Sequence, residues 1–276
     1  MLDLTNKVVL ITGCSRGLGP HIAQAFSRAG AHLAITARSA APLEALAQTL
    51  RAQGTRVSVI PADIADPKTH DTLYQRTVQE LGGLHVLVNN AGLESEGAFA
   101  DITPQAIAET VTVNVIAPMQ LTSCVLPHLL QQKQGQIINL SSTAGKKGAA
   151  YDAVYSGTKA ALVNWSAGLR AELAPANIGV SVICPGYVTE TGMFARFGIK
   201  PPAIIGSTTP QTVAAAIVRA AQRNPAEVIV NSMPIRPLLA LDALSPRFGN
   251  WFLKAIGLVA MQRHKADLSK QGKLER

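Results

Sequence analysis

Short runs of apolar residues alternate along the chain with longer segments rich in alanine and leucine. The apolar runs read as strands buried on both faces, and they cover residues 7–12, 32–36, 56–60, 85–89, 136–140, 179–183 and 227–231. Most of the longer segments between them have the composition of helices. Strands that alternate with helices predict a parallel sheet. We therefore expect an α/β fold, a single doubly wound Rossmann-type domain with a mostly parallel seven-stranded sheet and helices on both faces.

The longest uncharged run, residues 110–132, is long enough to raise the question of a membrane span. It contains Asn114, two prolines, several glutamines and His128. Such polar residues are costly in the apolar interior of a bilayer. The run therefore predicts a helix buried in the protein rather than a membrane span.

Length and composition indicate one domain. The 276 residues contain no repeat, low-complexity tract or Ser/Gly linker. We assign residues 1–235 to a nucleotide-binding catalytic domain and residues 236–276 to a basic, partly apolar extension of it. Three widely spaced cysteines indicate neither a disulfide framework nor a metal site, and the first residues lack the features of an export signal. A cytoplasmic protein is the simplest expectation.

The net charge of +8 is concentrated near the C-terminus. From residue 219 onward there are ten Lys or Arg against four Asp or Glu. A basic end can bind nucleic acid, anionic lipid or an acidic substrate. Aromatic residues make up only 4% of the chain and do not alternate with the basic ones, so we expect no nucleic-acid partner.

A glycine-rich loop follows the first strand directly. The sequence Thr12-Gly-Cys-Ser-Arg-Gly-Leu-Gly19 leads into a helical segment. Glycines let the backbone turn tightly beside a pyrophosphate, and the free N–H groups at a helix N-terminus favour its negative charge. Because the strand and the helix flank the loop, the motif predicts a dinucleotide site.

Two arginines indicate which dinucleotide binds. A site specific for NAD usually has an acidic residue near the end of the second strand, where this chain has Ala37 and Arg38. Arg38 and Arg16, in the glycine-rich loop, can pair with a 2′-phosphate, and either can also be a solvated surface charge. We expect NADP(H) as the preferred cofactor, with NAD(H) as the alternative.

Polar and small residues follow the third and fourth strands. Asp63 can accept a hydrogen bond from the adenine amino group, or it can cap the helix that starts near Pro67. The segment Asn89-Asn-Ala-Gly92 permits the close approach of a flat ligand. Asn114, inside the uncharged helix, can bond the backbone at a helix bend or hold a water in a proton path.

Three further side chains form the candidate catalytic group. Tyr155 and Lys159 are four residues apart in a helical segment, so they lie on one face. The cation is expected to lower the pKa of the phenol toward neutral pH. Ser142 follows the fifth strand and adds a hydroxyl. By itself Tyr-x-x-x-Lys is an ordinary amphipathic spacing.

The sixth strand ends in Cys184-Pro-Gly186, where the chain turns over the expected nicotinamide end of the cofactor. Residues 187–209 are apolar and contain several Gly and Pro without a clear period, which is typical of a substrate lid. Thr209-Pro210 then has the pattern of a helix N-cap and first turn.

In combination, the glycine-rich loop, Asn-Asn-Ala-Gly, Asn114, Ser142, Tyr155, Lys159 and Pro-Gly resemble the short-chain dehydrogenase/reductase family, in its compact subgroup, over roughly residues 5–231. The resemblance implies that Tyr155 is the general acid/base, that Ser142 binds the substrate oxygen, and that Asn114 orders a water next to Lys159. The residues expected at the cofactor are Gly13, Ser15, Arg16, Gly17, Leu18, Gly19, Arg38, Ser39, Asp63, Ile64, Asn90, Ala91, Gly92, Tyr155, Lys159, Pro185, Gly186, Val188 and Thr189.

The chain departs from the family pattern at two places. The family often has a threonine five positions beyond the proline, where this chain has Glu190 between Thr189 and Thr191. The last strand continues into a longer tail in place of an Asp-Gly-Gly turn. Residues 245–265 of the tail carry spaced apolar side chains. They can pack on their own or a neighbouring subunit, form a wall of an apolar substrate pocket, or touch a membrane surface peripherally.

These features predict an NADP(H)-dependent oxidoreductase that interconverts a ketone or aldehyde and an alcohol on an apolar, lipid-, steroid- or long-chain-like substrate. The resemblance further implies a homodimer or homotetramer formed through the helices that start near Asn114 and Tyr155. The alternatives are an NAD-preferring dehydrogenase of the same family and a nucleotide-sensing protein without catalysis.

Overall fold

The structure, a computed structural model, describes residues 2–271 and contains one seven-stranded sheet. The strands are β1 (Val8–Thr12), β2 (His32–Thr36), β3 (Val57–Val59), β4 (Val86–Asn89), β5 (Gly135–Leu140), β6 (Ile178–Pro185) and β7 (Glu227–Val230). All neighbouring strands are parallel, in the order β3-β2-β1-β4-β5-β6-β7. The predicted doubly wound sheet is thus confirmed. Its strands match the apolar runs because each strand of the sheet centre is buried along its whole length.

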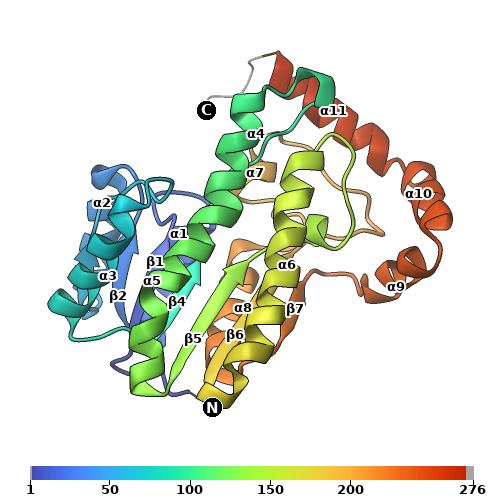
Figure 1. Ribbon diagram of the computed structural model, residues 1–276. Coiled ribbons are helices and arrows are strands. Elements are labelled where there is room, and N and C mark those ends of the chain that lie inside the picture. Colours follow the sequence, from blue (N-terminus) through green and yellow to red (C-terminus); the bar gives the residue numbers. More distant parts are fainter. Residues whose placement is uncertain (1, 272–276) are drawn as a thin grey trace.

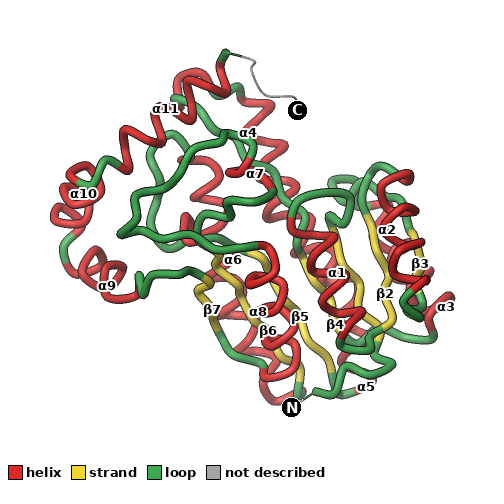
Figure 2. Tube along the Cα trace, turned by 180° about the vertical axis from the view of Figure 1, so that it is seen from behind, coloured by secondary structure: helices red, strands yellow, loops and turns green. Residues whose placement is uncertain are grey.

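Two layers of helices cover the sheet (Figures 1 and 2). On one face, α1 (Leu18–Arg28), α2 (Ala40–Ala52) and α8 (Pro210–Arg223) enclose a core around Phe26. On the other face, α3 (Lys68–Leu81), α5 (Ala117–Gln132) and α6 (Ala153–Leu173) enclose a second core. Thr209 caps α8 by accepting a hydrogen bond from the backbone N–H of Thr212, as the Thr-Pro pattern predicts.

The uncharged run forms a core helix with a break in it. Residues 104–132 are long and apolar enough to cross a membrane by length and composition. However, α5 buries Leu121, Val125 and Leu129 in the second core, so the predicted buried helix is confirmed. The run is not one regular α-helix, because a π-helical turn at Thr112–Ile116 separates α4 (Pro104–Val111) from α5. Asn114 lies in that turn.

Short elements complete the chain near the carboxyl ends of the strands. They are the 3₁₀ turns Phe99–Asp101 and Thr143–Gly145 and the helix α7 (Gly192–Ala195), whereas a third 3₁₀ turn, Ala174–Ala176, joins α6 to the amino end of β6. The turn at Thr143 joins β5 to α6, and α7 lies within the segment expected to be a lid. These elements surround the ends of β4, β5 and β6.

The C-terminal extension forms three helices, α9 (Arg236–Leu244), α10 (Pro246–Ala255) and α11 (Leu258–Lys270). Figure 1 shows them in red, leading away from β7 and returning beside α4 and α7. Gly257 separates α10 from α11 in a left-handed conformation, with a φ angle of 79°. The extension therefore closes back onto the edge of the domain where the strands end.

Candidate active site

Hydrogen bonds join the glycine-rich loop to the end of β4. The Thr12 hydroxyl oxygen accepts from the backbone N–H groups of Asn90 (3.0 Å) and Ala91 (3.1 Å), and Asn90 Nδ2 donates to the Thr12 carbonyl at 2.8 Å. Gly13 has a φ angle of 74°, and a Cβ there would lie 2.8 Å from the Ala91 Cα. Only glycine therefore allows the loop to approach β4 so closely.

A cavity of about 950 Å³ opens above the carboxyl ends of β1, β2, β4, β5 and β6. The side chains and backbone expected to bind the cofactor or substrate meet in its wall: Gly13, Ser15, Arg16, Gly17, Leu18, Arg38, Ser39, Asp63, Ile64, Asn90, Ala91, Gly92, Ser142, Tyr155, Lys159, Pro185, Gly186 and Val188. Residues spread over most of the domain thus line one space. Their functional roles stay predictions.

Three of the predicted site residues lie outside the cavity wall. Gly19 packs α1 against the loop, since a Cβ there would come within 2.1 Å of the Gly13 carbonyl oxygen. Asn114 is fully buried beneath the wall. Thr189 is exposed, whereas Thr191 lines the cavity, so Thr191 is the threonine placed to contact a cofactor. The cofactor role of Thr189 stays a prediction, although the residue does not line the cavity.

Arg16 and Arg38 lie at one end of the cavity, both exposed to solvent. Within residues 2–271, neither guanidinium forms a hydrogen bond or an ion pair with another side chain. Ala37 occupies the position where an acidic residue would repel a phosphate. The two cations are therefore available to an anionic ligand.

Asp63 lies in the cavity wall beside the ends of β2 and β3. Its Oδ1 accepts a hydrogen bond from the backbone N–H of Ala65 at 3.0 Å. Asp66, rather than Asp63, bonds the first turn of α3, accepting from the N–H of Lys68 at 3.0 Å. Of the two readings from sequence, the capping role of Asp63 is therefore wrong.

Asn114 holds the loop that follows β4. Its Oδ1 accepts from the backbone N–H of Leu93 at 2.7 Å, and its Nδ2 donates to the Leu93 carbonyl at 2.8 Å. The same Nδ2 also donates to the Thr158 hydroxyl at 3.0 Å, on the helix that carries Tyr155 and Lys159. Asn114 thus stabilises a bend in its own helix and links two walls of the cavity.

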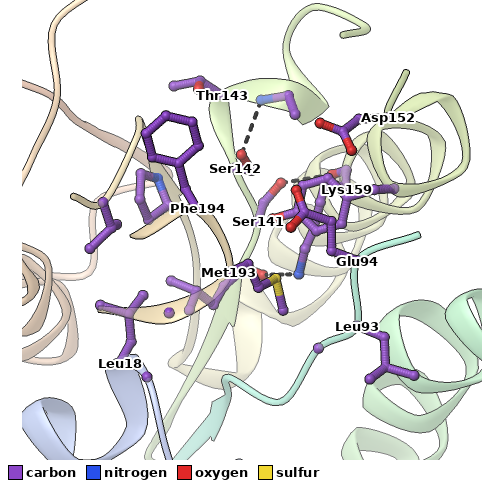
Figure 3. A pocket seen from close by; sticks show the side chains of 18 of the residues that line it. Leu18, Leu93, Glu94, Ser141, Ser142, Thr143, Asp152, Lys159, Met193 and Phe194 are labelled. Carbon is purple, nitrogen blue, oxygen red and sulfur yellow. Dashed lines mark hydrogen bonds between the residues drawn. The ribbon is translucent and has the colours of Figure 1, made fainter. Parts of the chain in front are cut away.

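Three candidate catalytic residues, Ser142, Tyr155 and Lys159, line the cavity, and Figure 3 shows Ser142 and Lys159. Ser142 follows β5, and its hydroxyl oxygen accepts a hydrogen bond from the backbone N–H of Ala144 at 3.1 Å. Lys159 Nζ donates to the Leu140 carbonyl at 2.8 Å and lies 5.6 Å from the centroid of the Tyr155 ring. Tyr155, Lys159 and Ser142 therefore share one pocket, which the spacing alone did not establish.

Burial, rather than the neighbouring cation, dominates the protonation of Tyr155. Desolvation raises its pKa, the negative charge of Glu94 raises it further, and the Ser142 hydroxyl opposes the shift. Burial also lowers the pKa of Lys159 to about 8. The expected fall of the Tyr155 pKa toward neutral pH is thus wrong for these residues by themselves, because desolvation of the phenolate is the largest effect and raises the pKa.

The expected lid forms much of the remaining wall. Tyr187 packs on Phe194 of α7 with ring centroids 4.5 Å apart, and Val188 pairs with Thr208 in a parallel bridge. Arg196 forms an ion pair with Glu96 on the loop after β4. Residues 187–208 are therefore fixed at both ends and contribute an apolar face to the cavity.

The C-terminal extension supplies the opposite apolar side. Leu238, Leu239, Leu253 and Leu258 line the cavity. Lys147 joins this wall to the rest of the domain through an ion pair with Asp242 at 2.8 Å. The extension packs on its own subunit and forms a pocket wall, which are two of the readings open from the sequence.

Sequence reasoning missed a buried ionic cluster in this wall. Lys265 of α11 donates to Glu94 Oε1 at 2.5 Å and to Asp152 Oδ2 at 2.8 Å. The burial of Gln262, Lys265 and Ala266, at spacings of three and one, marks the inward face of α11. Because two of these three residues are polar, hydrophobic spacing in the sequence neither marks this face nor names a partner for the lysine.

Three histidines near the strands and in the extension have structural contacts or face solvent. His70 Nε2 lies 2.8 Å from the Ile64 carbonyl oxygen, and His85 Nδ1 accepts from the N–H of Val8 at 3.1 Å. His264 is exposed. Among the residues that the structure describes, no three His, Cys, Asp or Glu side chains form a group suited to a metal ion.

Known proteins share both the sequence and the fold. A family model of the short chain dehydrogenases matches residues 7–200. The chain belongs to the short-chain dehydrogenase/reductase family. It is therefore an oxidoreductase, as the motifs predicted. The ketoacyl reductase HetN of Nostoc sp. (strain PCC 7120) is 36% identical to it over 272 residues, which cover 97% of this chain and 95% of HetN.

Solved structures of the family superpose on the chain. A short-chain dehydrogenase/reductase from Burkholderia phymatum in complex with NAD has a TM-score of 0.81 at 23% identity, covering 90% of this chain and 96% of its own. A metagenomic short-chain oxidoreductase in complex with NADP has a TM-score of 0.72 at 27% identity, covering 83% and 98%. These similarities support a nicotinamide cofactor and do not decide between NAD and NADP.

Proposed function

We propose that this short-chain dehydrogenase/reductase interconverts a ketone or aldehyde and an alcohol on an apolar substrate, with NADP(H) as its preferred cofactor. The observation that carries the proposal is a single cavity lined by two exposed arginines, Arg16 and Arg38, and by apolar residues of the C-terminal helices. Tyr155, Ser142 and Lys159 line the same cavity. A hydride donor and a carbonyl bound in it would adjoin these three groups.

The residues of the cavity fit a nicotinamide dinucleotide. The tight loop at Gly13 and the N-terminus of α1 suit the pyrophosphate, and Arg16 and Arg38 suit a 2′-phosphate. When bound, the cofactor supplies or accepts the hydride. The metagenomic relative in complex with NADP supports this preference. The Burkholderia phymatum structure contains NAD, which is the alternative cofactor.

The protein's own groups handle the proton. The neutral phenol of Tyr155 is the favoured form, since burial and Glu94 raise its pKa. A neutral phenol can donate its proton to a carbonyl oxygen during reduction, and Ser142 can donate a hydrogen bond to the same oxygen. Lys159 places a positive charge beside the phenol as it becomes phenolate, stabilising the product of the transfer.

The apolar walls and the named activity of HetN favour a substrate with a long acyl or alkyl chain. Leucines of α9, α10 and α11 line the same cavity as Met193 and Phe194 of the lid. The test measures NADPH and NADH oxidation with 3-oxoacyl thioesters, long-chain methyl ketones and steroid ketones. We expect NADPH-dependent turnover that rises with chain length. Turnover with NADH alone, or only with short polar carbonyls, would contradict the proposal.

We propose further that α9 and α10 contact an anionic membrane surface. Leu241, Leu244, Phe248 and Trp251 form an exposed apolar patch, in which Leu244 is 85% and Trp251 63% exposed. Arg247 lies within this patch and is itself exposed. Apolar side chains next to basic ones suit the boundary of an anionic bilayer. Because the inner faces of the same helices line the cavity, an apolar substrate could reach it from the membrane.

Cytoplasmic localisation and assembly into a homodimer or homotetramer stay predictions from the sequence. The assembly is expected to use helices that begin near Asn114 and Tyr155, which correspond to α5 and α6. Size-exclusion chromatography with light scattering measures the assembly directly. A mass of two or four chains supports the prediction, and a mass of one chain contradicts it.

A further inference from the structure

Lys265 is a buried cation that the C-terminal extension delivers to the active-site cavity. Its side chain is 2% exposed, and the side chains of its two partners, Glu94 and Asp152, are 8% and 5% exposed. The ammonium also lies 5.4 Å from the ring centroid of Phe197, in the lid segment. Figure 3 shows Glu94 and Asp152 close to Lys159. A charged group is rarely buried so fully unless it is paired.

Each partner of Lys265 belongs to a segment that positions Tyr155. Asp152 is the residue before α6 and lies three positions ahead of Tyr155. Glu94 follows Leu93, whose backbone is held from both sides by Asn114. Lys265 therefore joins three segments that are far apart in the sequence: the loop after β4, the start of α6, and α11.

The charges of the cluster formed by Lys265, Glu94 and Asp152 also affect the pKa of Tyr155. Glu94 and Asp152 both raise the Tyr155 pKa, in addition to the larger effect of burial. Burial raises the pKa of Asp152 to about 7, with Glu94 adding to the shift and Lys265 opposing it. Burial acts against the charged form of Lys265, but its two carboxylate partners overcome this and raise its pKa.

Other charged and titratable groups face the cluster from the neighbouring elements. They are Glu96 on the loop after β4, Lys159 on α6, Cys184 at the end of β6, and Tyr187 in the lid. Glu96 already forms an ion pair with Arg196 and accepts a hydrogen bond from Ser269 at 2.9 Å. Lys159 bonds the Leu140 carbonyl. Among the described residues, Lys265 is the cation that contacts both Glu94 and Asp152.

We propose that Lys265 is a positioning residue for catalysis: it balances the charge of Glu94 and Asp152 beside Tyr155 and holds the start of α6, so that the C-terminal extension is a working part of the active site. The proposal rests on the proposed role of Tyr155. It goes beyond that role because it assigns a function to a residue outside the family's matched region, residues 7–200.

The test follows alcohol oxidation, which requires the Tyr155 phenolate, as a function of pH. The substrate is the alcohol of whichever carbonyl in the panel above is reduced fastest. In Lys265→Met the uncompensated carboxylates disfavour the phenolate. We expect kcat/KM at pH 7 to fall about tenfold or more, and the rising limb of the profile to move up by about one pH unit. Lys265→Arg should retain a profile near that of the parent.

Three further variants, one of them a control, separate an electrostatic role from a purely structural one. Glu94→Gln removes a negative charge without shortening the side chain, so it should move the limb to lower pH. Glu94→Gln combined with Lys265→Met should return the limb toward the parent position. Lys270→Met, which breaks an exposed ion pair of the same helix with Asp101, should leave the profile unchanged. Limbs that coincide for the parent, Glu94→Gln and Lys265→Met would overturn the proposal.

If no carbonyl of the panel is reduced, that result contradicts the proposed function but not the proposed role of Lys265. A separate measurement tests Lys265 in that case. Urea unfolding then compares Lys265→Met, Glu94→Gln and the double variant. Coupling predicts that the double variant is destabilised less than the sum of the two single effects. Additive effects would contradict the coupling of this pair.

Discussion

The ammonium nitrogen of Lys159 lies 5.6 Å from the centroid of the Tyr155 ring and donates a hydrogen bond to the Leu140 carbonyl. Burial drives both groups toward their neutral forms, raising the pKa of Tyr155 and lowering that of Lys159 to about 8. A neutral phenol is the form that donates a proton during carbonyl reduction. Under the proposed function, Tyr155 is therefore in the protonation state that carbonyl reduction requires before any ligand adds its own charge.

Lys159 should make stability depend on pH in the alkaline range. The unfolded chain protonates a lysine up to about pH 10.4, whereas folded Lys159 releases its proton near pH 8. Between these values the unfolded state binds more protons, so the free energy of unfolding gains a contribution that rises with pH. Urea unfolding of the parent and Lys159→Met at pH 7.5 and 10 measures it. From pH 7.5 to pH 10, the unfolding free energy of the parent should rise relative to that of Lys159→Met. A difference between the two proteins that is the same at both pH values would contradict the lowered pKa of Lys159.

Asp152 should act in the opposite direction in the acid range. Burial and Glu94 raise its folded pKa to about 7, well above its value in an unfolded chain. The folded state then binds more protons between about pH 4 and 7, so this contribution to stability is full in acid and is lost as the pH rises to 7. Between about pH 4 and 7, the unfolding free energy of Asp152→Asn should fall less than that of the parent. Equal pH slopes in the parent and the variant would count against the raised pKa.

Arg38 should determine the preference for NADPH. A hydrogen bond to a charged group contributes about 1.5–3 kcal/mol, so Arg38→Ala should raise KM for NADPH about 10- to 100-fold. NADH lacks the 2′-phosphate, so its KM should change less than about threefold. Arg28→Ala is the control, because Arg28 is exposed at the other end of α1. If both cofactors weaken equally in Arg38→Ala, the arginine does not read the phosphate.

The apolar patch on α9 and α10 should bind anionic vesicles. The protein should co-sediment with phosphatidylserine-containing vesicles more than with phosphatidylcholine vesicles, and less at high salt, because screening weakens the basic contribution. Trp251→Glu should reduce binding at least about fivefold. Leu130→Glu, at an exposed apolar position of α5, is the matched control. Binding that is unaffected by Trp251→Glu would exclude this patch as the contact.

Local patterns in the sequence predicted most of the fold. The strands are recognisable because both faces are buried, and the predicted limits 32–36 coincide with those of β2. The glycine-rich loop was recognisable because Gly13 and Gly19 lie where a Cβ would collide with backbone atoms. The interruption of the uncharged helix was less visible, since the π-turn depends on bonds between Asn114 and Leu93, a residue 21 positions away.

The parts of the site that could not be predicted depend on distant contacts. Lys265 meets Glu94 across 171 positions and Asp152 across 113 positions of sequence. Nothing in the local pattern of α11 identifies those partners. The Tyr155 pKa differs from the sequence expectation for a similar reason: the Lys159 spacing is visible in the sequence, whereas the burial that raises the pKa is a property of the folded cavity.

Replacement of Tyr155 by phenylalanine tests the proposed chemistry most directly. The change removes the hydroxyl and leaves the ring that packs near Lys159. NADPH oxidation with the best carbonyl of the panel should fall about 100-fold or more in kcat, the range expected when a general acid is lost, while NADPH binding followed by fluorescence stays within about twofold. A Tyr155→Phe protein that reduces the carbonyl as fast as the parent would contradict the account.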